Sequence, residues 1–155
     1  MQIIVAVIGP SRAKDNELEF AEALGKLIAQ EGWVVVTGGK GGVMEAASKG
    51  ASAGKGISIG ILPESSRDFT NKYVDIAIPT GIGEARNFIV INSADAVVAV
   101  GYSTGTLIEM ASASRAGKLL LGYNVPKVPE VNYTTISSPV EAIEKIKNYL
   151  GGRND

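Results

Sequence analysis

A carboxylate, Glu109, follows a stretch of glycine and hydroxylated residues, GYSTGT, at residues 101–106. This stretch joins an apolar run, DAVVAV, to a helical pattern. Small residues at such a junction favour anion binding, because backbone N–H groups and the positive end of the helix point there. The letters from Thr106 to Glu109 also fit an S/T-x-x-E capping box. On this pattern alone we favour the cap, and we keep Thr104, Gly105 and Thr106 as candidate phosphate contacts.

A second glycine-rich stretch, GGKGG, lies between another apolar run and a small-residue helical pattern. Glycines let backbone N–H groups approach phosphate oxygens closely, although a tight turn would need glycines as well. Four glycines in five residues favour ligand binding. The stretch is neither a Walker A loop nor a G-x-G-x-x-G fingerprint, which weighs against ordinary P-loop hydrolysis and standard dinucleotide binding. Lys40 is either a phosphate contact or a solvated lysine; the candidates here are Gly38, Gly39, Lys40, Gly41 and Gly42.

Ser11 and Arg12 follow the first apolar run of the chain. Taken singly, they fit a turn serine and a solvated arginine. They become stronger candidates for phosphate contacts because the residues after each apolar run are of the same kinds: glycine, hydroxylated residues and a few cations. The carboxyl ends of parallel strands meet at one edge of a sheet, where ligands bind near a reversal of strand order. The sequence therefore predicts a shared anion site at that edge.

The elements that must position these residues alternate between strand and helix. The strand patterns cover residues 3–9, 33–37, 57–62, 74–80, 95–100 and 118–122, followed by a short run, TTIS. Helical patterns cover residues 15–30, the segment that begins at 43, a segment from Glu84, residues 105–116 and the C-terminal PVEAIEKIKNYL. The strands are near-continuously apolar rather than alternating, as in a parallel sheet covered by helices on both faces. We predict one α/β domain over 1–155: a three-layer, doubly wound, mainly parallel, Rossmann-like sheet.

Composition removes several chemistries. The chain has no cysteine and no histidine, which excludes thiolate catalysis, Ser-His-Asp catalysis and zinc sites of the usual kind, and we expect no metal site. Its net charge of -1 gives no electrostatic footprint for nucleic acid or an anionic membrane. The first residues lack a basic leader and are too short to cross a bilayer, so the expected location is cytoplasmic.

Together the motifs resemble the LONELY GUY and molybdenum-cofactor-carrier group of Rossmann-like proteins. The resemblance runs through VVTGGKGGVMEAASKGA, GILPE, VDIAIPTGIGEARN and SADAVVAVGYSTGTLIEM, in the expected order. Enzymes of this group carry a P-G-G-x-G-T-x-x-E motif, and Gly105, Thr106 and Glu109 match its second half. Arg86, nine residues before Asp95, matches their essential arginine. In this chain, Gly101-Tyr102-Ser103 replaces P-G-G, and Asn87 replaces a lysine after the arginine.

The resemblance implies two functions. The first is a binding or carrier protein for a phosphorylated nucleotide or cofactor-like ligand, with no cofactor required for chemistry. The second is a phosphoribohydrolase that cleaves the N-glycosidic bond of a nucleoside 5′-monophosphate, in which Glu109 stabilises the sugar cation and Arg86 holds the substrate. A third reading is a regulatory protein with a vestigial pocket. Proteins of this group form homodimers or larger homo-oligomers, which the resemblance implies here.

Overall fold

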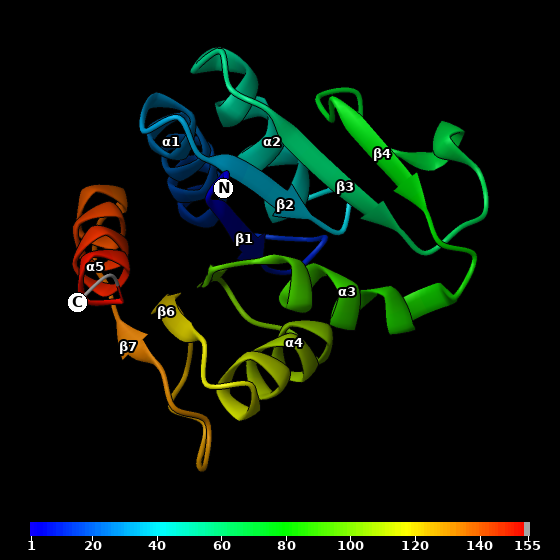
Figure 1. The fold of residues 1–155 in the computed structure, drawn as a ribbon. Helices are drawn as coiled ribbons and strands as arrows, with labels where there is room; N and C mark the ends of the chain where they lie inside the picture. Colours follow the sequence, from blue (N-terminus) through cyan, green and yellow to red (C-terminus); the bar gives the residue numbers. More distant parts are fainter. Residues whose placement is uncertain (154–155) are drawn as a thin grey trace.

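A computed structural model describes residues 1–153, so Asn154 and Asp155, the end of the predicted 1–155 domain, lie outside the described residues. One parallel sheet crosses this part of the chain in the order β4-β3-β2-β1-β5-β6-β7 (Figure 1). Its strands are β1 (Ile4–Ile8), β2 (Val34–Thr37), β3 (Ser58–Leu62), β4 (Ile76–Pro79), β5 (Ala96–Val100), β6 (Leu119–Tyr123) and β7 (Thr134–Thr135).

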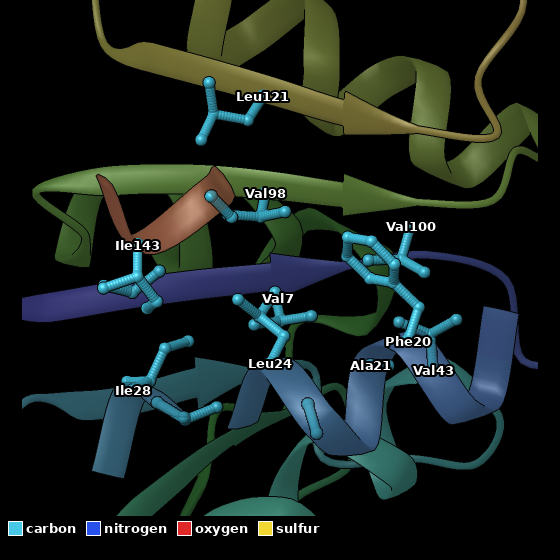
Figure 2. Packing of buried hydrophobic residues seen from close by; sticks show 14 of the residues in the cluster. Val7, Phe20, Ala21, Leu24, Ile28, Val43, Val98, Val100, Leu121 and Ile143 are labelled. Atoms are coloured by element: carbon cyan, nitrogen blue, oxygen red, sulfur yellow. The ribbon is translucent and has the colours of Figure 1, made fainter. Parts of the chain in front are cut away.

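Helices cover both faces of the sheet (Figure 1). They are α1 (Asp15–Gln30), α2 (Val43–Ala53), α3 (Arg86–Ser93), α4 (Thr104–Arg115) and α5 (Pro139–Gly152), with short 3-10 turns η1 (Arg67–Phe69) and η2 (Gly83–Ala85). Side chains alternate along β1: Val5 and Val7 pack towards α1, α2 and α5, while Ala6 and Ile8 pack towards α3 and α4. Figure 2 shows the first of these two cores. The central strands are therefore buried on both faces, which explains their continuously apolar sequence.

The three-layer, doubly wound architecture confirms the predicted fold class, and the seven strands of the described chain are all parallel. Residues 86–93, whose apolar content also suits a strand, form the helix α3. The edge strand β4 differs from the other predicted strands, because its residues alternate between exposed and half-buried, with Ile76 and Ile78 exposed. The partner of Ile76 across the ladder is Ile59, which packs on the α3–α4 side. The two exposed isoleucines therefore lie on that side.

The order of the strands reverses at β1. From β1 the chain adds β2, β3 and β4 on one side, then crosses back to place β5 on the other. The loops after β1 and β5 consequently leave the sheet in different directions and open a crevice at its carboxyl edge. A side chain on Gly9, at the end of β1, would lie 2.2 Å from the Val100 carbonyl oxygen at the end of β5. Glycine thus lets these two strand ends approach each other below the crevice.

None of the helices within residues 1–153 is long and apolar enough to cross a membrane.

Candidate functional site

A cavity of about 290 Å³ opens at the point where the strand order reverses. It is lined from four directions: the end of β1 with the loop after it, the glycine-rich loop after β2, the start of α3, and the first turns of α4. The predicted candidates among its lining residues are Ser11, Gly38, Lys40, Arg86, Gly105, Thr106 and Glu109. Residues that are far apart in the sequence therefore meet at one edge, as the comparison of strand-end loops predicted.

Arg86 is buried at the start of α3, with an exposed fraction of 5%. Its Nε donates to the Ile61 carbonyl oxygen at 2.9 Å, and its Nη2 donates to the Gly38 carbonyl oxygen at 3.4 Å. Its Nη1 donates to Glu84 at 3.1 Å and to Asn87. The guanidinium thus holds the ends of β2 and β3 together, and few of its five N–H groups are left for a ligand.

Position 38 has no room for a side chain, because the Arg86 guanidinium lies against it. A side chain on Gly38 would lie 2.7 Å from Nη2 of Arg86 and 2.9 Å from the Met44 sulfur. The absence of a Cβ at this position therefore makes room for the buried guanidinium and does not serve a ligand directly.

Glu109 lies half-buried in the second turn of α4 and faces the cavity. It forms no hydrogen bond within residues 1–153. Burial raises the pKa of Glu109 to about 8, although the Arg86 guanidinium acts to lower it and the Glu84 carboxylate acts to raise it. At neutral pH the protonated form of Glu109 therefore dominates, so its side chain can both donate and accept a hydrogen bond.

The capping box predicted from Thr106 to Glu109 is wrong. The helix begins one residue earlier than expected, and Ser103 is its N-cap: its Oγ accepts from the Thr106 N–H at 3.2 Å. Glu109 therefore lies six positions beyond the cap, too far along the helix to bond back to it. Ser103 stands three residues before Thr106 and was not selected by the capping-box pattern, because the residue three positions after it is a threonine and not an acid.

The first turn of α4 presents free amides. The N–H groups of Thr104 and Gly105 have no acceptor within residues 1–153, and no acidic side chain occupies this turn. A Cβ on Gly105 would meet only the Ser103 Oγ, at 3.8 Å. The N-terminal end of α4 is thus open, uncapped by any carboxylate, and directed at the cavity where Gly105 and Thr106 line it.

The glycine-rich loop after β2 is tied down by the protein. Gly39 donates its N–H to the Thr37 Oγ1 at 3.0 Å, and its carbonyl oxygen accepts from the Asn71 N–H at 2.9 Å. Lys40 pairs with Glu64 at 2.5 Å and donates to the Phe69 carbonyl oxygen at 2.8 Å. Of this loop, Gly38 and Lys40 line the cavity, and the Lys40 ammonium is already held by protein groups.

The remaining candidates lie around this cavity. Gly39 faces β3, where a Cβ would lie 2.4 Å from the Leu62 Cδ2. Arg12 and Gly42 line a neighbouring groove together with Ser11. Gly41 and Thr104 line neither hollow. The cavity wall also includes polar and polarisable side chains that the sequence reasoning did not select as ligand contacts: Met44, Glu84, Asn87 and Ser103. In the sequence, three of them could have been found by their position next to residues already selected. Glu84 and Asn87 flank the motif arginine, and Ser103 precedes the helix.

Among described residues, no cluster of three or more acidic side chains has a geometry that would hold a metal ion.

Comparison with known proteins agrees with this architecture. The model of the SLOG cluster4 family (LDcluster4) matches residues 2–149. An uncharacterized protein from Archaeoglobus fulgidus is 39% identical over 139 residues, which covers 90% of this chain and 91% of that protein.

Solved structures of similar length superpose closely. The molybdenum cofactor binding protein from the phototrophic bacterium Rippkaea orientalis is 40% identical, with a TM-score of 0.91 over 97% of this chain and 98% of that one. The Moco carrier protein from Chlamydomonas reinhardtii is 36% identical, with a TM-score of 0.88 over 98% and 99% of the two chains. The strand-end motifs, the fold they build and the match over residues 2–149 agree, and the chain belongs to the SLOG cluster4 family.

Proposed function

We propose that the protein binds and carries a small phosphate-bearing molecule, a nucleotide or a molybdenum-cofactor-like compound, in the cavity at the strand reversal. The observation that carries the proposal is the open first turn of α4, which has two unpartnered amides, lines the cavity with Gly105 and carries no competing carboxylate. The likeness to proteins described as cofactor binding or carrier proteins supports it.

Removal of a single amide hydrogen tests this assignment. Thr104 is the first residue of α4, a position that accepts proline because its N–H has no partner inside the helix. The chain itself provides the precedent, since α5 begins with the same serine cap followed by Pro139, and both serines have extended backbones. The Thr104→Pro variant should therefore fold normally and lack one of the two unpartnered amides at the helix end beside the cavity.

The measurement is a thermal-shift titration with AMP, GMP and a reduced pterin phosphate. A ligand at a hundredfold excess over its Kd stabilises the folded state by about 2.7 kcal/mol. We expect stabilisation of the wild type by at least one compound, a loss of about tenfold in affinity in Thr104→Pro, and little change in Thr104→Ala, which keeps the amide. Equal affinity in all three proteins would refute the assignment to α4.

The raised pKa of Glu109 favours hydrolysis of a nucleoside 5′-monophosphate as a second candidate. A protonated carboxyl in the cavity suits a general acid that donates a proton to the departing base, whereas stabilising a sugar cation needs the ionised form. Incubation with AMP should then release adenine, with a rate that falls as pH rises through about 8. A Glu109→Gln variant with unchanged release of adenine would contradict this role.

We also propose that the chain forms homo-oligomers through its α3–α4 side. Exposed apolar side chains gather there from β4, α3 and α4: Ile76, Ile78, Phe88, Ile89 and Ile108. Such surfaces mark interfaces more often than free surface. Light scattering should give a mass above that of one 16.1 kDa chain. The Phe88→Glu variant should lower that mass, and a monomeric wild type would contradict the proposal.

A further inference from the structure

A second hollow of about 630 Å³ lies beside the proposed ligand cavity. It is a groove between the N-terminal parts of α1 and α2, and Ser11 lines both it and the cavity. The cavity alone, at about 290 Å³, is at the small end of ligand pockets, which run from about 300 to 1,000 Å³. A ligand that fills both hollows would therefore have two bulky parts.

The boundary between the hollows is a fixed ridge, Pro10–Ser11. The Pro10 carbonyl oxygen accepts from the Val43 N–H at 3.2 Å. Gly42 packs under the ridge with a φ of 65°, and a side chain there would lie 2.4 Å from the Pro10 oxygen. The ridge is thus held on the first residue of α2, and Ser11, which is exposed, lies between the two hollows and lines both.

The walls of the groove suit a planar ring. Ala13, Leu18 and Ala46 supply apolar surface, and Tyr73 supplies an aromatic face. Lys72 lies 5.2 Å from the centre of the Tyr73 ring and covers one of its two faces.

Arg12 adds a second stacking surface. Within residues 1–153 it forms no hydrogen bond or salt bridge, so its planar guanidinium is available to a ring.

The charges of the groove favour an uncharged ring. Its two cations, Arg12 and Lys49, are matched in number by two carboxylates, Glu22 and Glu45. Lys49 is paired with Glu22 at 3.6 Å across the two helices. A further anionic group would gain little here, whereas a heterocycle with hydrogen-bonding edges meets both donors and acceptors.

From these observations we infer that the groove between α1 and α2 is a second subsite, which holds a nucleobase-like ring joined through phosphate to the part of the ligand in the cavity. The inference rests on the proposed function. It narrows the ligand to a dinucleotide or a nucleotide-conjugated cofactor, whose bridging phosphates cross the ridge at Ser11 beside the first turn of α4.

Calorimetric titration of the wild-type chain tests the inference with three probes for each base: the nucleoside monophosphate, the nucleoside diphosphate and the symmetrical dinucleoside diphosphate of adenosine and of guanosine. Stacking of one base contributes about tenfold or more in affinity. We expect a dinucleoside diphosphate to bind at least about tenfold more tightly than the monophosphate, and the plain diphosphate to resemble the monophosphate.

Variants of two groove residues test whether the higher affinity for the dinucleoside diphosphate arises in the groove. Arg12→Ala and Tyr73→Leu should each remove about fivefold to tenfold of affinity for the dinucleoside diphosphate and leave monophosphate affinity unchanged. The chain offers a matched control pair on α5, where Arg153 lies 5.5 Å from the Tyr149 ring; Arg153→Ala and Tyr149→Leu should change neither affinity.

Four results would overturn the inference. A plain diphosphate that binds as tightly as the dinucleoside diphosphate would attribute the gain to charge. Equal losses for both probes in the Arg12 and Tyr73 variants would attribute them to the cavity. If no phosphate-bearing probe binds the wild type, the proposed function fails and the second subsite fails with it, whereas monophosphate binding without a gain for the dinucleoside diphosphate refutes the subsite alone.

Discussion

Glu17 and Glu109 are two carboxylates near the starts of helices that leave the same edge of the sheet, and their surroundings differ in every respect. Glu17 is 5% exposed; its Oε1 accepts from the Lys14 N–H at 3.0 Å and its Oε2 accepts from the Asn124 Nδ2 at 2.9 Å. Glu109 faces a cavity and has no hydrogen-bond partner within residues 1–153. A buried carboxylate with all its partners stabilises a fold, whereas one without them awaits a ligand or a proton.

The two helix starts differ in the same way. Glu17 neutralises the first turn of α1 and, through Asn124, links it to the loop after β6. The first turn of α4 carries no acid and keeps two amides free. The protein therefore closes one of these two helix ends with its own carboxylate and leaves the other without one.

The largest expected difference between the two carboxylates is in the pH dependence of stability. The pKa of Glu109 rises from 4.5 to about 8 in the folded state, chiefly through burial. The folded state then binds more protons than the unfolded state between these values, so stability falls as pH rises from about 4.5 to 8.

Glu109→Gln removes this titration. Relative to that variant, the free energy of unfolding of the wild type should fall by an amount on the order of a few kcal/mol between pH 4.5 and 8.5. Urea titrations of both proteins across this range measure the difference, in which the other titrating groups cancel. If the free energy of unfolding depends on pH in the same way in both proteins, Glu109 is solvated, and the proposed difference in surroundings between Glu109 and Glu17 would be wrong.

A smaller loss, in stability alone, is expected for Glu17→Ala. It strips the Lys14 N–H and the Asn124 amide of their acceptor, which costs about 2 kcal/mol. Glu19→Ala, on the exposed side of the same helix, is the control and should change stability by less than about 0.5 kcal/mol. Chemical denaturation at pH 7 measures both, and similar values for the two variants would show that the bonds of Glu17 contribute little.

The smallest expected effect is that of removing a helix cap, and it distinguishes the cap of α4, which borders the cavity, from the cap of α5. Ser103 caps α4 and Ser138 caps α5 with the same geometry, accepting at 3.2 Å and 3.1 Å. Ser103→Ala and Ser138→Ala should each cost about 1 kcal/mol of stability. Only Ser103→Ala should also weaken binding of the phosphate probe that stabilises the wild type, because its helix start borders the cavity. If both variants bind the probe equally well, the ligand does not contact the first turn of α4.

The fold was predictable because burial on both faces leaves a clear trace: β1 and β5 consist of apolar residues alone, and β2 of three valines and one threonine. The meeting of the loops after β1, β2 and β5 followed from parallel topology. Local geometry was less accessible. The capping-box pattern pointed to Thr106, whereas Ser103 caps the helix.

The glycine-rich loop shows the same limit. Its composition suggested a phosphate cradle, yet Asn71 and Glu64, remote in sequence, hold its backbone and its lysine. Such partners leave no periodic or local signal, because their role depends on which loops the sheet brings side by side. The resemblance singled out Arg86 and Glu109, whereas the hydrogen bonds of Arg86, and the lack of a side-chain partner for Glu109 within residues 1–153, became apparent only in three dimensions.

The hydrogen bonds of Arg86 affect how its variants should be interpreted. This one guanidinium joins the carbonyl ends of two neighbouring strands, at Gly38 and Ile61, to the beginning of α3. Replacing it would let the floor of the cavity spread before any ligand arrived. Loss of activity in an Arg86 variant would therefore reflect a distorted cavity. Only a substitution that preserves both carbonyl contacts could distinguish a direct role of Arg86 in chemistry from its role in shaping the cavity.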